Sequence, residues 1–368
     1  MKVREITEGL ERLAPPALAE SWDNSGLTVG DPDAEVNRIV VTLDVTEDTL
    51  DYAAAMGAEL IVAHHPLIFG KLAAVRADDP VGRLVMKAVG SSIAVYGMHT
   101  NLDNAPGGMN DELADRLGMM DRRPLVPLRG AYKVAVTVPD EHAEAVMNAM
   151  FDAGAGKMGH YDRCAFKMEG EGTFRPLDGA HPFVGQRETT ARVPEEKLEA
   201  LVDQAHLDGV LAALAKAHPY EHPAVDVIEL FRQRTDLGTG RVGRIVPIRG
   251  EEFLPWLKEK LDLAFVRVCG TLPKWVEKVA VLGGSGAAYI SEAACSGTDV
   301  YVTGDMKHHD ALLAKELGLP VVDAGHYGLE KHGVHWLIRG LQNTLNELQY
   351  KQIEILVDAV GMDPFYLG

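Results

Sequence analysis

The first and last thirds of the chain alternate short apolar runs with stretches of helical length, and this rhythm constrains the fold more than any other feature. Each apolar run has the length of one strand, and most of the helical stretches end at a glycine, as helices commonly do. A β-α-β-α order of this kind predicts a parallel or mixed sheet with helices on its faces. The expected fold class is therefore α/β.

Two pairs of segments indicate that these two thirds are related. Residues 57–66 (GAELIVAHHP) resemble residues 297–309 (GTDVYVTGDMKHH), because a glycine, an apolar strand and polar ligand-type residues follow one another in both. Residues 91–103 (SSIAVYGMHTNLD) correspond in the same way to residues 319–330 (LPVVDAGHYGLE). This weak repeat predicts two similar α/β lobes facing each other. Ligands from the strand ends of both lobes would meet in the cleft, where open α/β sheets bind ligands.

The middle of the chain has a different composition, and a chain of 368 residues is long enough for more than one core. A predicted strand and helix are followed by a glycine-rich segment typical of a hairpin, then by a second helix and a strand. This order is a ferredoxin-like α+β pattern. An inserted domain explains this better than a continuous doubly wound sheet. We expect a first lobe over residues 1–129, an inserted domain over 130–232 and a second lobe over 233–368.

Charge and composition restrict the partners. The chain has 36 Lys and Arg against 54 Asp and Glu, a formal charge of −18, which argues against nucleic-acid and anionic-membrane partners. No export signal and no apolar window of about 18 residues is visible. The three cysteines lie far apart and show neither a disulfide framework nor a zinc-binding spacing. We expect a cytoplasmic protein whose partner is a small-molecule substrate.

Two adjacent histidines, His64 and His65, follow the apolar strand of residues 58–63. Consecutive strand residues point to opposite faces, so two arrangements are open. A turn at Pro66 would bring both rings to one site, or each ring would serve one of two neighbouring metal ions. The alternative without a metal is a solvent-exposed loop pair.

Further candidate ligands come in two short motifs. The two-residue period of HTNLD places His99, Asn101 and Asp103 on one face of an extended segment. Asp103 is the predicted ligand of a divalent cation, with His99 and Asn101 hydrogen-bonded to ligands; the alternative for Asp103 is a turn residue. His326 and Glu330 are four residues apart, so on a helix they share a face and can ligate one ion or bridge two. An exposed helix start is the alternative.

The metal-ligand candidates are His64, His65, Asp103, His326 and Glu330. Three imidazoles and two carboxylates suffice for two divalent ions with positions left for water, and they suit Zn, Fe, Mn or Co.

Two other motifs near the expected cleft carry weaker signals. In GDMKHHD, Asp305 is interpreted as a helix cap, and His308 or His309 as a proton shuttle or a partner of a metal ligand. The glycines of residues 282–286 (LGGSG) form either an anion-binding turn or a tight turn only.

These motifs together resemble the Nif-three-like family, whose members are also named GTP cyclohydrolase 1 type 2 homologs. The matching text is SWDNSGLTVG, LDVT, GAELIVAHHPLIF, HTNLDNAPGGMNDELA, GRVGRI, VLGGSG, DVYVTGDMKHHDAL and DAGHYGLE, in order over nearly the whole chain. The resemblance implies a dinuclear metal site at the five candidates above and a toroidal homohexamer, a trimer of dimers. It also implies that the insert is PII-like or CutA-like.

The family name implies hydrolytic opening of the guanine imidazole ring of GTP with loss of formate. In that reaction His99 or His308 would transfer protons as a catalytic residue. Two alternatives stay open. One is another metal-dependent hydrolase, such as a phosphoesterase, and the other is a non-catalytic, metal-binding regulatory assembly.

Overall fold

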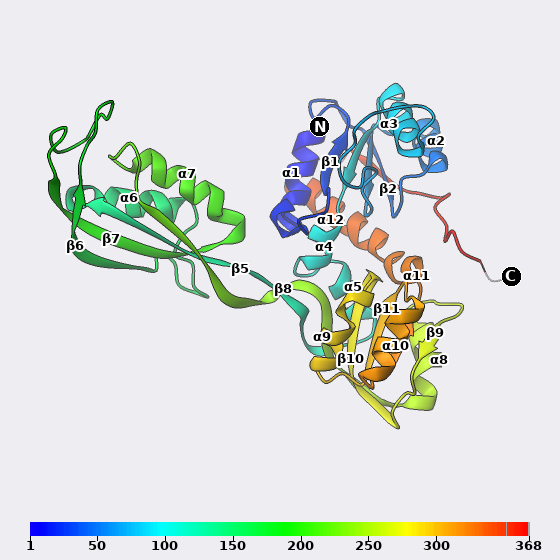
Figure 1. Ribbon diagram of the computed structural model, residues 1–368. Coiled ribbons are helices and arrows are strands. Elements are labelled where there is room, and N and C mark those ends of the chain that lie inside the picture. The colour runs from blue at the N-terminus through cyan, green and yellow to red at the C-terminus, as the bar shows by residue number, and fades with distance from the viewer. Residues whose placement is uncertain (351, 367–368) are drawn as a thin grey trace. The chain divides into compact units, whose positions relative to one another are not determined.

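The computed structural model describes residues 1–350 and 352–366, and the chain divides into two compact units. Unit 1 spans Met1–Leu128 and Thr235–Gly368, and unit 2 spans Arg129–Arg234. Two long strands, β5 (Met120–Pro139) and β8 (Val225–Arg249), have residues in both units. None of the helices among the described residues combines the length and apolarity needed to cross a bilayer. The predicted α/β fold class is confirmed as a mixed fold of several sheets and helices (Figure 1).

The first sheet of unit 1 has the strand order β1-β4-β3-β2-β13. Strands β13, β2, β3 and β4 are parallel, and β1 pairs antiparallel with β4 at one edge. The strands are β1 (Gly26–Val29), β2 (Arg38–Thr42), β3 (Leu60–Ala63), β4 (Ala94–Gly97) and β13 (Glu354–Val357). The helices packed with it are α1 (Val3–Leu13), α2 (Glu47–Ala55), α3 (Pro80–Gly90) and α12 (Gly333–Glu347). Helix α4 (Thr100–Asn104) follows β4 and contacts the 3-10 turn Pro16–Leu18, which follows α1.

Both faces of this sheet are buried, which explains why its strands read as unbroken apolar runs. Along β2, Ile39 and Val41 lie in the core cluster with α1 and α12, whereas Val40 between them lies in the cluster with α2 and α3. Two of the covering helices begin at side-chain caps, because Thr46 and Asp79 each accept a hydrogen bond from a backbone N–H of the first turn.

The second sheet of unit 1 has the strand order β8-β10-β11-β12-β9. Strands β10, β11 and β12 are parallel, while β8 and β9 pair antiparallel at either side. The strands are β9 (Arg267–Cys269), β10 (Trp275–Ser285), β11 (Val300–Gly304) and β12 (Val321–Asp323). The helices are α5 (Met109–Arg116), α8 (Gly250–Lys260), α9 (Ile290–Cys295), α10 (His308–Glu316) and α11 (His326–Glu330), with the 3-10 turn Ala287–Tyr289 before α9.

The two sheets repeat one order of elements, since β9-β12-β11-β10 in the second matches β1-β4-β3-β2 in the first. The last helix of each repeat packs on the sheet of the other repeat. Helix α5 follows α4 but packs on β10, and α12 follows α11 but packs on β2 and α1. Each half of unit 1 therefore completes the core of the other half.

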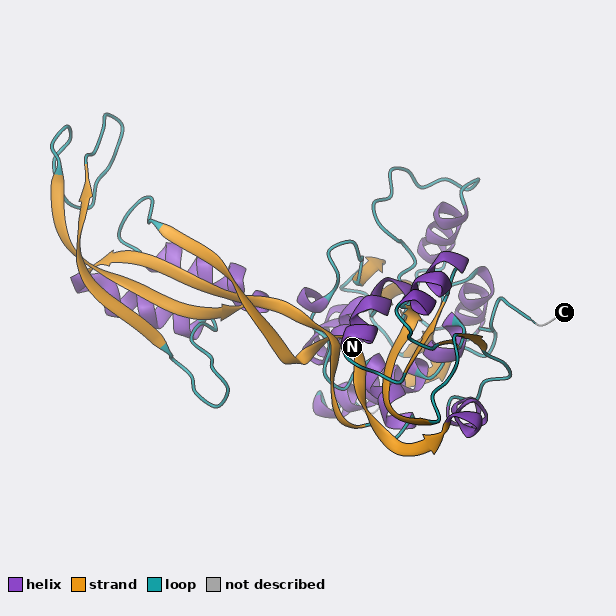
Figure 2. Ribbon diagram, turned by 60° about the horizontal axis from the view of Figure 1, so that its bottom comes forward, coloured by secondary structure: helices purple, strands orange, loops and turns teal. Residues whose placement is uncertain are grey.

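Unit 2 contains β6 (Ala165–Phe174), β7 (Ala191–Asp203), α6 (Asp140–Asp152), α7 (Leu207–Ala217) and the 3-10 turn Gln204–His206. Strand β7 pairs antiparallel with both β6 and β5, in the order β6-β7-β5. Side chains of α6 and α7 share one core cluster with β5 and β7, so both helices cover the same face of the sheet (Figure 2).

Candidate metal centre

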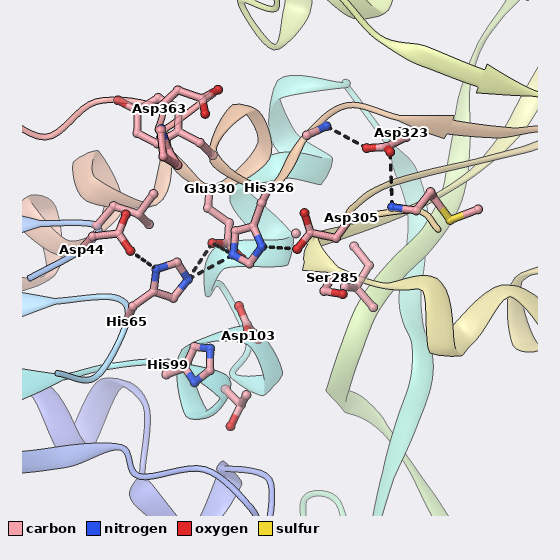
Figure 3. A pocket seen from close by; sticks show the side chains of 18 of the residues that line it. Asp44, His65, His99, Asp103, Ser285, Asp305, Asp323, His326, Glu330 and Asp363 are labelled. Carbon is pink, nitrogen blue, oxygen red and sulfur yellow. Dashed lines mark hydrogen bonds and ion pairs between the residues drawn. The ribbon is translucent and has the colours of Figure 1, made fainter. Parts of the chain in front are cut away.

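A cleft of about 1090 Å³ opens in unit 1 where parallel strands of both sheets reach their carboxyl ends. Its walls include residues that follow β3, β4, β11 and β12. Open α/β sheets place ligand-binding side chains at these strand ends because the chain leaves the sheet there. Figure 3 shows the imidazoles and carboxylates that gather in this cleft.

His64 and His65 directly follow β3, and both turn toward the same centre. Their ring centroids are 4.9 Å apart, and the side chain of His64 is fully buried. Both rings lie near the Glu330 carboxylate, and each also has neighbours of its own. His64 lies 3.9 Å from Asp103 Oδ1, whereas His65 lies near the His326 ring at a centroid distance of 5.1 Å.

The HTNLD segment is helical, so the prediction of an extended segment is wrong. His99 precedes α4, and Asp103 N donates a backbone hydrogen bond to His99 O, which places the two residues one turn apart. Asn101 points away from the centre, because its side chain is fully buried and donates to Ala14 O at 2.7 Å. The sequence HTNLD is compatible with both an extended and a helical conformation. Burial of Asn101 against the segment after α1 favours the helix.

His326 and Glu330 occupy the single helical stretch α11, as the four-residue spacing predicted. The Glu330 carboxylate lies between the two halves of the cleft. Its Oε2 is 2.9 Å from His326 Nε2 and 3.0 Å from His65 Nε2, and its Oε1 is 3.7 Å from His64 Nε2.

Each of the four imidazoles in the cleft is held through its Nδ1 atom. His64 Nδ1 donates to Met98 O at 2.7 Å. The acceptors for the other three are carboxylates at 2.7–2.8 Å: Asp44 for His65, Asp23 for His99 and Asp305 for His326. A hydrogen bond of this kind fixes the orientation of the ring and directs Nε2 toward the centre, where the neutral imidazole can bind a metal.

Three donor atoms converge as ligands of one ion would. His65 Nε2, His326 Nε2 and Glu330 Oε2 lie 2.9–3.2 Å from one another. Donors placed about 2.0–2.2 Å from a metal are roughly 2.8–3.6 Å apart in octahedral or tetrahedral geometry. A second group, His64, His65 and His99, has ligand atoms within 4.8 Å of one another.

Three buried atoms in this centre have no hydrogen-bond partner among the described residues: His64 Nε2, Asp103 Oδ1 and Glu330 Oε2. Buried polar atoms are nearly always paired, because an unpaired one keeps the cost of losing its water. All three atoms belong to candidate ligands, so the residues present fit divalent cations.

The electrostatics of the apo centre follow from this crowding. Burial by itself lowers the pKa of His65, but the carboxylates of Asp44 and Glu330 beside its ring raise it to about 10. Burial likewise opposes protonation of His326, and Glu330 and Asp305 raise its pKa to about 9. Burial raises the pKa of Asp103 to about 7. A bound cation would replace protons at such a site.

Gly284, in the glycine segment 282–286, lets Glu330 approach the backbone. Its φ of +65° suits glycine, and a Cβ there would lie 2.4 Å from Glu330 Oε1. The strand β10 extends through this segment to Ser285. Close approach of a ligand side chain thus explains the glycine better than a tight turn alone.

The structure of the GDMKHHD motif differs from the one that its sequence indicated. Helix α10 is preceded by Lys307, so the interpretation of Asp305 as a helix cap is wrong, and this residue instead orients His326. His308 and His309 are exposed at the start of α10 and do not line the cleft. The proton transfer predicted for His308 stays a prediction that its position does not favour.

Sequence reasoning missed two carboxylates that hold histidines, Asp23 and Asp44. Asp23 lies in a polar loop and has a fully buried carboxylate, which also accepts hydrogen bonds from Ser25 and Thr100. Asp44 lies two residues after β2. Its position just past the carboxyl end of a strand was the available signal.

Comparison with known proteins identifies the family. The profile of the family described as Duf34/NIF3 (NGG1p interacting factor 3) matches residues 1–363. The chain belongs to the Duf34/NIF3 family. The resemblance noted from the sequence motifs is therefore confirmed.

Similar members of the Duf34/NIF3 family come from several bacteria. The protein named GTP cyclohydrolase 1 type 2 homolog of Bacillus subtilis is 41% identical over 365 residues, covering 98% of this chain and 97% of its own length. The protein of the same name from Halalkalibacterium halodurans is 40% identical, with the same shares covered. Among solved structures, a Bacillus cereus protein related to NIF3 has 39% identity and a TM-score of 0.74, covering 100% of this chain and 99% of that one.

Proposed function

We propose that this Duf34/NIF3 protein holds two divalent metal ions at His64, His65, Asp103, His326 and Glu330 and is a hydrolase of a nucleotide such as GTP. The observation that carries the proposal is the approach of His65 Nε2, His326 Nε2 and Glu330 Oε2 to within 2.9–3.2 Å of one another. The orphaned atoms of His64 and Asp103 support a second ion beside the first, with Glu330 between them.

Divalent ions in such a centre would polarise the substrate and lower the pKa of a bound water. The chain's own residues hold the donors in place. Asp44 and Asp305 orient the His65 and His326 rings, and the main-chain oxygen of Met98 orients His64. The ions Zn, Fe, Mn and Co all suit this mixture of imidazoles and carboxylates.

His99 is the candidate general acid–base residue. Asp23 fixes its Nδ1, and its ring lies 5.4 Å from that of His64 and 5.5 Å from that of His65, so Nε2 is available at the edge of the centre. The dyad resembles other Asp–His pairs in which the carboxylate fixes the tautomer and the imidazole transfers the proton.

The shape of the cleft favours a substrate with a planar ring. Trp22 and Phe69 each pack edge to face against His99, at 5.8 and 5.5 Å, and both are 61% exposed toward solvent. Exposed aromatic faces beside a reactive centre can stack on a base. The name carried by relatives, GTP cyclohydrolase 1 type 2 homolog, supports GTP as the first substrate to test.

The test joins metal analysis with turnover. The purified protein is expected to contain about two divalent ions per chain, to release formate from GTP, and to lose both ions and turnover after Glu330→Ala. His99→Gln is expected to keep the metal and to slow turnover by roughly 10²- to 10⁴-fold, the usual contribution of a general acid–base group.

His308→Gln is the matched control, since this histidine lies outside the cleft, and it should leave turnover unchanged. Phosphate release in place of formate would favour the alternative of a phosphoesterase. Tight metal retention without turnover on a nucleotide panel would favour a metal-binding regulatory assembly and would contradict the hydrolase.

We further propose that unit 2 is the inserted ferredoxin-like, PII-like or CutA-like domain. Its order β5-α6-β6-β7-α7-β8, with both helices on one face, supports this. The homohexamer implied by the family resemblance and the cytoplasmic location stay predictions, and light scattering of the purified protein checks the first.

A further inference from the structure

A second cleft, of about 650 Å³, is formed entirely by residues of unit 2. Its walls come from β6, from β7, from the loop of residues 175–183 and from the segment 220–224 after α7. A volume of this size is typical of small-molecule sites, which combine apolar walls with a few polar groups. None of these residues belongs to the metal centre.

One carboxylate in this cleft is buried without a cation. Glu195, on β7, is only 8% exposed, and its Oε1 accepts a hydrogen bond from Tyr220 Oη at 2.8 Å. Among the described residues, no Lys or Arg forms an ion pair with it, whereas the next residue, Glu196, is paired with Lys167 at 3.0 Å. A buried carboxylate without a cation is costly, and a ligand cation would relieve that cost.

The sequence of β6 makes room for this carboxylate. A Cβ at Gly172 would lie 2.4 Å from Glu195 Cδ and Oε2, so any other residue would push the carboxylate out of its position. Glycine inside a strand usually weakens it, and its presence often marks the close approach of another group. Here the group that approaches is the side chain of Glu195.

Aromatic rings form the walls beside the carboxylate. Phe174 and Tyr220 meet edge to face at a centroid distance of 5.6 Å, and Phe183 lies 6.3 Å from Tyr220. Phe183 is 49% exposed, so it stands at the mouth of the cleft. Aromatic faces attract cations and also bury apolar groups.

The cations that line the cleft are already neutralised. Arg175 pairs with Glu188, and Lys197 pairs with Glu199 at 3.3 Å. A bound anion such as a phosphate would have to compete with these carboxylate partners. The remaining charge of the cleft is negative.

We propose that the cleft of unit 2 binds an organic ammonium ion with an apolar body, with Glu195 as its counterion and Phe174, Phe183 and Tyr220 as its walls. The proposal is independent of the function proposed for the metal centre, because it uses no residue of unit 1.

Calorimetric titration of the metal-loaded, full-length protein with phenethylammonium chloride tests this proposal. We expect saturable binding, no binding of the neutral analogue 2-phenylethanol, and none of the anion phenylacetate. Glu195→Gln keeps an acceptor for Tyr220 but removes the charge, and it should weaken binding about tenfold or more, the effect of losing one charged hydrogen-bond partner.

Glu171→Gln is the matched control, because Glu171 lines the same cleft but is exposed and paired with Arg192 at 2.6 Å. It should leave the affinity within about twofold, as expected for an exposed pair. Should Glu195→Gln fail to fold in a thermal melt, Phe183→Ala at the exposed mouth decides instead, with an expected loss of several-fold from the missing ring.

Several results would overturn the proposal. These are no saturable binding of phenethylammonium at millimolar concentration, equal binding of 2-phenylethanol, or binding that neither Glu195→Gln nor Phe183→Ala weakens. Binding that persists in both variants and disappears in Glu330→Ala would place the probe at the metal centre and would likewise count against it.

Discussion

The histidines of the candidate metal centre are held in place by hydrogen bonds to oxygens behind their rings. Four imidazoles share one arrangement, with Nδ1 donating to an oxygen and Nε2 facing the cleft. The sequence showed the histidines because they directly follow apolar runs or open a helix. It did not single out Asp23 or Asp44, because a single aspartate in a polar loop is common in any protein, and only folding brings it to a ring 76 or 21 residues away.

Asp44→Ala is expected to weaken metal retention by roughly 10- to 100-fold, the usual cost of removing the hydrogen-bond partner of a ligating histidine. The reason is that His65 loses the acceptor 2.7 Å from its Nδ1 and with it the fixed tautomer. Competition with a chromophoric chelator measures the change. Asp48→Ala, at an exposed position in the first turn of α2, serves as the control and should retain metal as the wild type does.

Gly284→Ala is expected to displace Glu330 and so to release metal, because the added Cβ would stand 2.4 Å from Oε1. Gly318→Ala is a matched control, since its φ of +66° is nearly that of Gly284 at +65°, yet nothing lies within 4 Å of its added Cβ. Both variants should lose about 1–2 kcal/mol of stability from the left-handed backbone. Only Gly284→Ala should lose metal in the chelator assay, and equal retention would contradict this account of the glycine.

At the scale of elements, the exchange of α5 and α12 joins the two halves of unit 1. Their amphipathic patterns predicted helices but not which sheet each would cover, because an apolar stripe fits any apolar face. A buried ion pair secures one of the exchanged helices: Arg241 on β8 donates two hydrogen bonds to Asp111 on α5, at 2.7 and 2.9 Å. Arg241 also donates to Ala105 O at 3.1 Å, just after α4.

Arg241→Met is expected to destabilise the protein by about 3 kcal/mol, the low end for breaking a buried ion pair. It removes both hydrogen bonds from Arg241 to the Asp111 carboxylate and leaves Arg122, at 3.4 Å, as the remaining cation. Urea unfolding followed by circular dichroism measures this. Arg244→Met on the same strand is the control, since its side chain is 62% exposed and lies 3.9 Å from Glu277, and it should change stability by less than about 1 kcal/mol. Similar losses of stability in the two variants would argue against the Arg241–Asp111 ion pair as the contact that secures α5.

The same pair predicts a pH dependence. Burial by itself would raise the pKa of Asp111, but the hydrogen bonds and charge of Arg241 outweigh it and hold the pKa below the ordinary 3.8. A carboxylate with a lowered folded-state pKa contributes its full stability above the ordinary value and loses it as the pH falls through the folded value. Unfolding free energies should therefore fall below about pH 4, and less steeply in Asp111→Asn. Identical slopes between pH 5 and pH 3 in the two proteins would contradict this.

At the scale of the whole molecule, the rhythm of strands and helices was enough to predict the α/β class, and the strand ends were enough to predict where imidazoles and carboxylates come together. The helical form of residues 100–104 was beyond the sequence pattern, because HTNLD fits a period of two as well as a turn of helix. Burial of Asn101 and the hydrogen bonds of Thr100 to Asp23 stabilise the helical conformation of that segment. Both depend on residues more than 70 positions away.

The covering of the first sheet by α12 has a consequence for synthesis on the ribosome. Leu337 and Leu341 complete the core that begins with Val3 and Ile6, and β13 supplies the neighbour that β2 otherwise lacks. Until residues 333–357 have been translated, the nascent amino-terminal half keeps an open strand edge and an uncovered apolar face, both of which invite association with other chains. Nascent chains arrested after residue 331 should therefore be protease-sensitive and bound by chaperones, whereas chains extended past residue 357 and clear of the ribosome should resist digestion.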